Sequence, residues 1–406
     1  MFEFRFQPLK TVYFLYFISS ILFVRLPYWV ISSLIPAWRP RTSWTLFRTL
    51  NVNALRSMID AFYATGSFPA DDPEKSAQSA DKLGFVWIDP LPAALLTGEI
   101  ASAARANNVV STRTHGYWYG KDVGSGAHGQ KASPNEKVLY FLHGGAFIMG
   151  TACPANPSGH GPAIVDLMKH CSAIFDRAFC LDYRLASSAP LKVANPFPAA
   201  IIDAVAGYRY LVENLGFQAR NIIVCGDSAG GQLAFCLIRY LAQEALPSLP
   251  PPGTAVLVSP PGGCTHDYSP TSSMTVNARS DFVKTIFHCG FTARSLLGSL
   301  PPEEIETNTW LSPSSPRIDT TGLFSNFPPT CIIVGGAEQA LDSMKTLHHR
   351  LVADNDPKQI TYWEYPDAAH AFLMTNFQEP EKTEASKALA QWICEIYGGG
   401  EVKGNN

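Results

Sequence analysis

A serine lies between two glycines at the point where an apolar strand-like run gives way to a helical pattern. The segment Gly226–Asp227–Ser228–Ala229–Gly230 follows "NIIVC" and leads into "AGGQLAFCLIRYLAQEA". A sharp strand-to-helix turn places the serine hydroxyl above the sheet, and the flanking glycines avoid collisions with neighbouring backbone. The N-terminus of the following helix adds positive potential at this point. The motif is weak by itself, but in this context it predicts that Ser228 is a nucleophile.

A serine hydroxyl needs a base, and the base needs a carboxylate to orient it. Among the ten histidines, His370 alone stands just after a strand-like run, Ile360–Tyr365, and before a C-terminal helical pattern. We therefore expect His370 to be the base.

The acid should follow the preceding strand, in "TCIIVGGAEQALDSM". Glu338 comes soon after Gly336, where the loop is expected to be still above the sheet. Asp342 is expected in the first turn of a helix, where a carboxylate stabilises the helix dipole for structural reasons. Glu338 is the predicted acid, and Asp342 is the second choice.

The segment His143–Phe147, "HGGAF", follows the apolar run "KVLYFL". Attack on an ester builds negative charge on the carbonyl oxygen, and losing one preorganised donor costs about 2.7–4 kcal/mol. The amides of Gly144, Gly145 and Ala229 are the predicted donors, and His143 is expected to hold the loop through its ring. The alternative for this segment is a plain tight turn.

Strand-like and helical segments alternate after residue 109. We expect strands at 137–142, 178–183, 221–225, 254–258, 330–334 and 360–365, with helices near 198–214, 230–244, 340–353 and 382–397. This alternation predicts a mostly parallel sheet with helices on both faces. Residues 39–105 are predicted to form a helical cap region, and residues 261–310 an insertion over one edge of the sheet.

The segment Thr11–Trp38 is apolar apart from Arg25 and is longer than the roughly 20 residues that cross a bilayer. Arg25 is costly in mid-span, and Pro27 is expected to bend a helix. Three interpretations remain open: a signal anchor, a bent monotopic hairpin, and a helix packed on the soluble domain. The cationic residues that follow the segment favour a cytosolic catalytic portion.

Seven ordered motifs resemble the hormone-sensitive-lipase family of α/β-hydrolases: "HGGAF", "DYRLA", "PFPAA", "GDSAG", "LSP", "GGAEQALD" and "HAF". The resemblance covers roughly residues 100–397 and implies an α/β-hydrolase fold. The implied organisation is an N-terminal anchor (1–38), a cap (39–105) and a catalytic domain (106–406) containing the 261–310 insertion. The anchor is similar to that of membrane-bound arylacetamide deacetylase-like and fungal steryl-acetate esterases.

The resemblance implies a carboxylesterase that needs no cofactor or metal and cleaves a short-acyl ester of a lipophilic alcohol at a membrane, expected to be the endoplasmic reticulum. An acyltransferase or lactone-forming enzyme with the same triad is the alternative, and a non-catalytic ligand-binding member is a third. A net charge of −3 gives no basic field for nucleic acid. Nine dispersed cysteines argue against a disulfide framework or a zinc site. The oligomeric state, the alcohol and the acyl group stay open.

Overall fold

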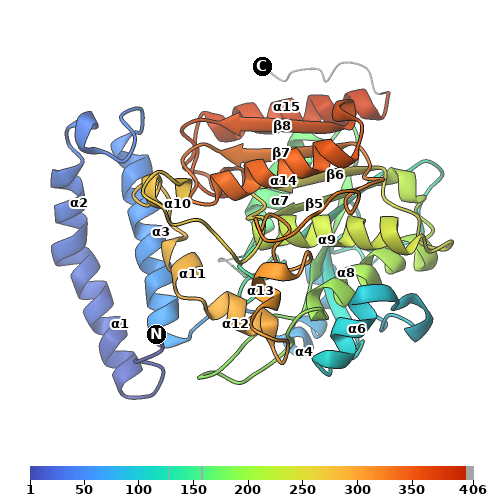
Figure 1. Ribbon diagram of the computed structural model, residues 1–406, viewed down its shortest axis with the longest axis horizontal. Helices are drawn as coiled ribbons and strands as arrows, with labels where there is room; N and C mark the ends of the chain where they lie inside the picture. The colour runs from blue at the N-terminus through green and yellow to red at the C-terminus, as the bar shows by residue number, and fades with distance from the viewer. Residues whose placement is uncertain (127, 157–158, 399–406) are drawn as a thin grey trace.

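One eight-stranded sheet forms the centre of the protein (Figure 1). The computed structural model describes residues 1–126, 128–156 and 159–398. The strand order is β1-β2-β4-β3-β5-β6-β7-β8, with β1, β2 and β4 pairing antiparallel and all pairs from β4 to β8 parallel. The predicted mostly parallel sheet is therefore confirmed. The strands are β1 (Phe85–Ile88), β2 (Thr114–Gly120), β3 (Val138–Leu142), β4 (Arg177–Asp182), β5 (Ile222–Asp227), β6 (Thr254–Val258), β7 (Thr330–Gly335) and β8 (Ile360–Tyr365).

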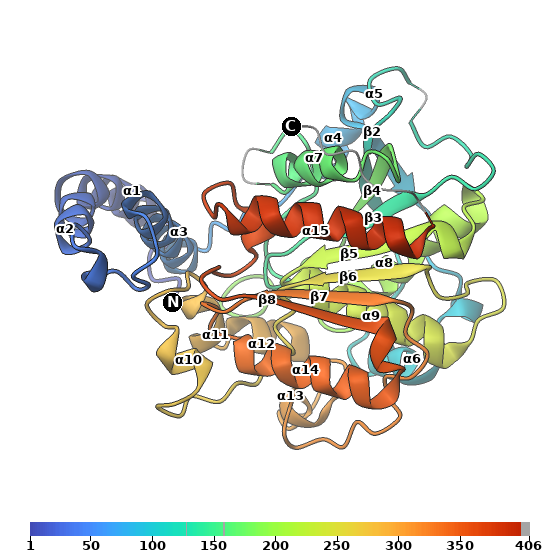
Figure 2. The same cartoon turned by 90° about the horizontal axis from the view of Figure 1, so that it is seen from above.

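Helices cover both faces of the sheet, as Figure 2 shows. Along β3, Tyr140 and Leu142 belong to the core formed with α8 and α9, whereas Leu139 and Phe141 belong to the core formed with α7 and α15. This alternation follows from the two-residue period of a strand buried on both faces. The helices of the two layers are α6 (Gly98–Ala106), α8 (Ala199–Arg209), α9 (Ala229–Glu244) and α14 (Leu341–Asp354) on one face, and α7 (Gly161–His170) and α15 (Glu381–Ile396) on the other.

The expected boundary between the cap and the catalytic domain is wrong for residues 85–105. β1 pairs antiparallel with β2 and extends the sheet, and α6 contributes Ile100 and Ala104 to the core of the catalytic domain. Two short helices, α4 (Pro73–Ala77) and α5 (Ala80–Leu83), precede β1. The catalytic body therefore begins earlier in the chain than residue 106.

The insertion joins β6 to β7, which are internal neighbours in the sheet, and it lines the cavities beside Ser228 and His370 at the carboxyl ends of the strands. Its helices are α10 (Ser273–Val276), α11 (Lys284–His288), α12 (Phe291–Leu297) and α13 (Glu304–Thr307). It packs against α3 (Leu46–Thr65) and the start of α14. The insertion and α3 therefore form one cap, whose core includes Ile59, Tyr63, Phe282 and Phe291.

The N-terminal apolar segment forms one helical stretch, Leu9–Ser32, beside α3 (Figures 1 and 2). It consists of α1 (Leu9–Ser20), a π-helical turn (Ile21–Arg25) and α2 (Leu26–Ser32). α2 packs against α3. α3 itself begins at the N-cap Thr45, whose hydroxyl accepts from the Arg48 amide, and ends at Gly66 with a φ of +67°.

Candidate active site

Ser228 occupies a strained turn between β5 and α9, with a φ of +52° and ψ of −122°. The two glycines of the motif are sterically required. A Cβ on Gly226 would lie 2.2 Å from the Gly230 carbonyl oxygen, and a Cβ on Gly230 would lie 2.0 Å from that of Leu142. A non-glycine residue in so sparsely populated a region is typical of a functional position. The turn leaves the serine side chain partly exposed above the sheet.

Ser228, His370 and Glu338 form a continuous hydrogen-bonded chain. The Ser228 Oγ lies 2.7 Å from His370 Nε2, and His370 Nδ1 lies 2.7 Å from Glu338 Oε2. The three residues come from the loops after β5, β8 and β7, whose carboxyl ends meet at the same edge of the sheet. A neutral His370 that donates from Nδ1 to the carboxylate presents a lone pair at Nε2, which the serine hydroxyl can use as an acceptor.

The second oxygen of Glu338 is also bound. Oε1 accepts from the Ser259 hydroxyl at 2.7 Å and from the Gly335 amide at 2.6 Å. The same Ser259 hydroxyl accepts from the Ala371 amide at 3.0 Å and so joins the acid to the histidine loop. Two donors fix the carboxylate orientation and stabilise its charge in a fully buried position. Ser259 was not predicted, because no motif marks it.

The pKa of His370 is raised above its usual 6.5. Burial lowers this pKa, but the hydrogen bond and charge of Glu338, together with the charges of Asp281 and Asp227, raise it by more. The buried carboxylate therefore stabilises the imidazolium that would form when Ser228 loses its proton.

Asp281, in the insertion, lies behind the acid loop and was not predicted. Its side chain is fully buried and accepts from the amides of Gln339 and Phe282, each at 2.7 Å. Burial raises the pKa of Asp281 to about 6. This carboxylate ties the insertion to the loop that carries Glu338.

Asp342, the second-choice acid, lies in the first turn of α14 as expected but binds the insertion. Its Oδ2 accepts from the Ser273 amide at 2.7 Å, and its own amide donates to the Ser273 hydroxyl at 3.0 Å. The structure thus brings His370 together with Glu338, and it gives Asp342 a partner on the cap.

The predicted oxyanion donors need one correction. The Gly144 amide donates to Asp227 Oδ1 at 2.9 Å, so this N–H is already used and the prediction for Gly144 is wrong. In the part of the chain that the structure describes, no hydrogen bond uses the amides of Gly145, Ala146 or Ala229. Gly145 has a φ of +121°, and a Cβ there would lie 2.0 Å from the Met149 carbonyl oxygen. Ala146 keeps its N–H and, with a φ of +56°, continues the same turn.

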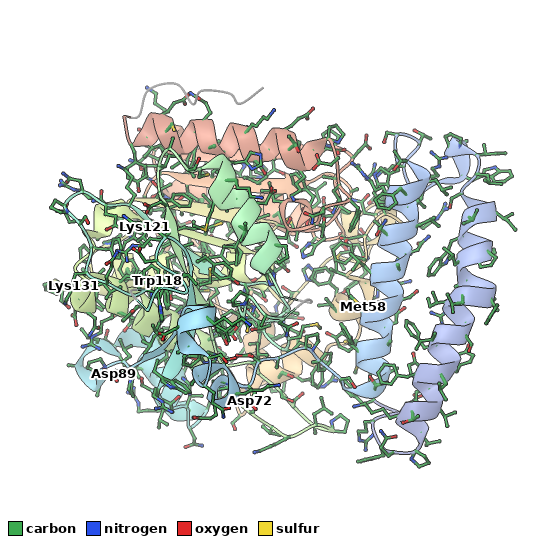
Figure 3. The ribbon with its side chains drawn as sticks, turned by 180° about the vertical axis from the view of Figure 1, so that it is seen from behind. Met58, Asp72, Asp89, Trp118, Lys121 and Lys131 are labelled. Carbon is green, nitrogen blue, oxygen red and sulfur yellow. The ribbon has the colours of Figure 1, made fainter. Side chains whose placement is uncertain are left out.

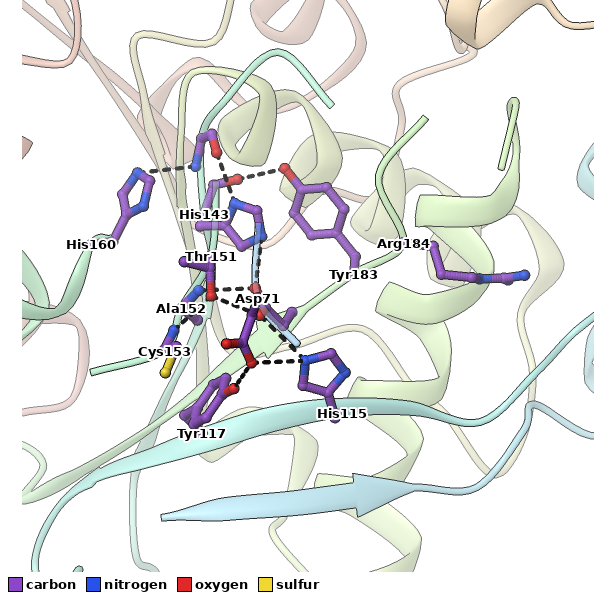
Figure 4. A network of polar contacts seen from close by, with 12 residues as sticks. Asp71, His115, Tyr117, His143, Thr151, Ala152, Cys153, His160, Tyr183 and Arg184 are labelled. Carbon is purple, nitrogen blue, oxygen red and sulfur yellow. Dashed lines mark hydrogen bonds and ion pairs between the residues drawn. The ribbon is translucent and has the colours of Figure 1, made fainter. Parts of the chain in front are cut away.

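A buried polar network holds the loop of these amides from behind (Figure 4). His143 approaches the Gly144 carbonyl with Nδ1 at 2.7 Å and Asp182 Oδ1 with Nε2 at 3.1 Å. Asp182 also accepts from the Thr151 hydroxyl and the Ala152 amide. The Tyr183 hydroxyl donates to the His143 carbonyl at 2.7 Å. His143 is therefore placed to hold the loop through its ring, as expected.

The far end of this network contains the residues best suited to a metal ion, Asp71, His115 and Asp182, with ligand atoms within 4.8 Å of one another. These atoms have protein partners. Asp71 accepts from the Tyr117 hydroxyl, and His115 Nε2 lies 3.3 Å from Asp182. The cluster joins the segment before α4 to β2 and β4, so its role in this structure is to connect these three segments.

Two apolar cavities meet at Ser228 and His370. The larger encloses about 250 Å³ between the serine and α3, and the smaller encloses about 60 Å³ between the serine and the insertion. Ala146 and Ser228 line both. The helix α3 contributes Leu55, Met58, Ile59 and Phe62 to the larger cavity.

Comparisons with known proteins agree with this fold. Residues 139–374 match the family described as alpha/beta hydrolase fold. EstE7, a hormone-sensitive-lipase homologue from a metagenome library, superposes with a TM-score of 0.54 at 24% identity, covering 86% of this chain and 96% of its own. An esterase from the bacterial hormone-sensitive lipase family gives a TM-score of 0.54 at 21% identity, covering 87% and 99%.

Curated relatives share the sequence over most of their length. An acetyl-hydrolase of Streptomyces hygroscopicus is 28% identical over 270 residues, covering 66% of this chain and 79% of the relative. The esterase LipU of Mycobacterium tuberculosis is 26% identical over 273 residues, covering 66% and 80%. The fold and these matches define an α/β-hydrolase with esterase relatives. The chain belongs to the alpha/beta hydrolase fold family and is a carboxylesterase.

Proposed function

We propose that this carboxylesterase hydrolyses a short-acyl ester of a lipophilic alcohol through an acyl-enzyme on Ser228. The observation that carries the proposal is the chain of two 2.7 Å contacts from Ser228 through His370 to Glu338. A second observation supports it: among the described residues, no hydrogen bond uses the amides of Gly145, Ala146 and Ala229.

In the proposed acylation, Ser228 Oγ attacks the ester carbonyl carbon while His370 Nε2 takes the hydroxyl proton. The amides of Gly145, Ala146 and Ala229 donate to the oxyanion of the tetrahedral intermediate. The C–O bond to the alcohol then breaks, and the imidazolium returns its proton to the leaving oxygen. Glu338 stabilises the imidazolium throughout.

Deacylation repeats these steps with water. His370 takes a proton from water, the hydroxide oxygen attacks the acyl carbon, and the bond to Ser228 breaks as the serine regains its proton. The products are a carboxylic acid and the free enzyme. An acceptor alcohol in place of water would give the acyltransferase alternative with the same residues.

The substrate class follows from the cavities and the relatives. The helix α3 and the insertion contribute apolar side chains to the larger cavity, which favours a lipophilic alcohol, and the smaller cavity suits a short acyl group. Relatives include the acetyl-hydrolase above and an ethyl acetate hydrolase of Pseudomonas putida, 31% identical over 126 residues, covering 30% of this chain and 35% of the relative. We further propose that residues 1–38 attach the protein to a membrane. The proposal that this membrane is the endoplasmic reticulum is based on the family resemblance alone.

A fluorophosphonate probe tests the nucleophile. We expect the full chain to be labelled on Ser228 and the Ser228→Ala variant to stay unlabelled while retaining the wild-type circular dichroism spectrum. Equal labelling of the two proteins would exclude Ser228. Turnover of 4-nitrophenyl acetate with and without an added alcohol then separates hydrolysis from acyl transfer, because only transfer yields a new ester.

A further inference from the structure

The apolar helix Leu9–Ser32 has no buried side chain, although the structure describes all 24 of its residues. Large apolar side chains project from it into solvent, including Leu15 (63% exposed) and Phe23 (78% exposed). So large an exposed apolar surface marks an interaction site. At 1.5 Å per residue the helix is about 36 Å long, which also satisfies the length of a membrane span.

The N-terminal end of this helix is fastened to the cap. Phe2 is fully buried, and its ring centroid lies 4.8 Å from that of Phe291 in the insertion. Its amide donates to the Tyr63 carbonyl at 2.7 Å, and the Phe4 amide donates to the Ala64 carbonyl at 3.0 Å. The residues before the helix therefore belong to the core that covers the active site.

The other end is fastened to the same body. Arg39 donates to the Ser33 and Trp44 carbonyls, which closes the turn between α2 and α3. Arg41 then donates to Asn277 Oδ1 at 2.7 Å and to the Gly336 carbonyl at 2.9 Å, two residues before Glu338. Both ends of the apolar helix are thus bound to the catalytic body.

A crossing helix would place its two ends on opposite sides of a hydrocarbon layer of about 30 Å. Phe2 would then have to leave its buried site, or α3 would have to enter the layer with the helix. The second alternative is costly because α3 carries Arg48, paired with Glu381, and Arg56, bound to the Asp281 carbonyl. We propose that the helix Leu9–Ser32 lies in the plane of one membrane leaflet, with both ends on the catalytic side.

The charge around the helix identifies a lipid surface as its partner. Residues 4–45 contain five cationic side chains, Arg5, Lys10, Arg25, Arg39 and Arg41, and no Asp or Glu. The helix is apolar on all sides, so its surface can be buried among acyl chains, while the basic residues at its ends are attracted to an anionic leaflet.

This orientation places the membrane next to the proposed substrate cleft. The helix α3 packs against α2 and also forms a wall of the larger cavity, through Met58 and Phe62 among others. Figure 3 shows Met58 on the side of α3 that faces the catalytic domain. Packed helix axes lie about 8–10 Å apart, so one helix separates the leaflet from the cavity beside Ser228. An ester dissolved in the membrane then has a short path to the site; this last step rests on the proposed function.

Cysteine labelling in sealed microsomes that contain the full chain tests the orientation. The variants are Glu3→Cys, at a 74% exposed side chain before the helix, and Lys358→Cys, at an exposed position of the catalytic domain. The wild-type chain measures background labelling of the native cysteines. We expect a membrane-impermeant maleimide to label both variants from the same side. Labelling of one variant before permeabilisation and of the other only afterwards would demonstrate a crossing helix and overturn the proposal.

Vesicle flotation tests the partner without an activity readout, so its failure is distinct from failure of the proposed function. We expect the full chain to float with vesicles containing anionic lipid and the double variant Leu15→Glu/Phe23→Glu to stay in the soluble fraction. The control Val110→Glu changes an equally exposed apolar residue (66%) of the catalytic domain and should float. A wild-type chain that ignores vesicles and dimerises through this helix would show that a second copy covers the face, which overturns a lipid partner.

Discussion

At the scale of single residues, the choice between two carboxylates is testable. Glu338 accepts from His370, whereas Asp342 binds the amide of Ser273 on the cap. Removing the charge that stabilises the imidazolium typically costs on the order of 10⁴ in kcat. We expect Glu338→Gln to lose nearly all turnover. Asp342→Asn should keep most of it and lose about 1–3 kcal/mol of stability with its charged hydrogen bond.

Steady-state kinetics with 4-nitrophenyl acetate, together with thermal unfolding of both variants, checks this prediction. Unfolding separates a lost acid from a lost fold, because Glu338→Gln should still unfold cooperatively. Full activity in Glu338→Gln, or an inactive but folded Asp342→Asn, would reverse the two assignments.

The raised pKa of His370 sets the direction of the pH profile. The base must be neutral to take the serine proton, so activity falls as the pH falls through the pKa of this imidazole. Glu338 raises that pKa above the usual 6.5, so the acid limb should be centred above 6.5 in the wild type. The rate of fluorophosphonate labelling against pH measures this limb. In Glu338→Gln the imidazolium loses its charged partner, so the midpoint of the acid side of the profile should move to lower pH. An unchanged midpoint would mean that the titration of another group determines the acid side of the profile.

A site residue could be predicted from the sequence only where a local motif marks it. Ser228, His370 and Glu338 each follow a recognisable strand, and the structure brings all three together. The Gly144 prediction is wrong because the side chain that uses its amide, Asp227, lies 83 residues away in the chain. Ser259 has no motif of its own, so its bond to Glu338 becomes apparent only when β6 and β7 are adjacent.

At the scale of elements, the loop after β3 is the most constrained. We expect Gly145→Ala to lower kcat by about 10²–10³, because the positive φ and the contact with Met149 force the loop to move its donors. The matched control is Gly322→Ala, where φ is +75° and no atom lies within 4 Å of the new Cβ. The control carries a backbone penalty of about 1–2 kcal/mol without a collision and should keep its rate.

Kinetics on both alanine variants at a temperature where both are folded checks this expectation. Equal loss of kcat in the two would show that backbone strain alone, and not displacement of the amides, is the cause.

The elements themselves were predictable where burial is complete. Strands β3 to β8 lie within about two residues of their predicted ranges. The first five are buried throughout, and the half-buried β8 is marked by its β-branched and aromatic residues. β1 was missed because a run of four residues is short for a strand and follows two short helices, although Gly84 and Asp89–Pro90 bound it. β2, Thr114–Gly120, was missed because its polar and aromatic composition does not form an apolar run, and its place in the sheet depends on pairing with residues of β4 that lie 57 or more positions later.

At the scale of the whole molecule, the sequence predicted membrane attachment but left three arrangements open. Length and composition alone cannot separate a crossing helix from one that lies flat, because both need the same apolar residues. The burial of Phe2 under the cap is a tertiary contact with residues 61 and 289 positions further along, and no local pattern encodes it. This contact favours the in-plane arrangement.

The in-plane helix predicts different behaviour on dissolved and membrane-bound esters. With a lipophilic acetyl ester carried in anionic vesicles, Leu15→Glu/Phe23→Glu should lower turnover strongly, because the enzyme no longer stays where the substrate is. The same variant should hydrolyse water-soluble 4-nitrophenyl acetate at the wild-type rate, since the site behind α3 is unchanged. The control Val110→Glu should match wild type on both substrates. Equal loss on both esters would mean that the helix supports the cap and has no part in reaching the membrane.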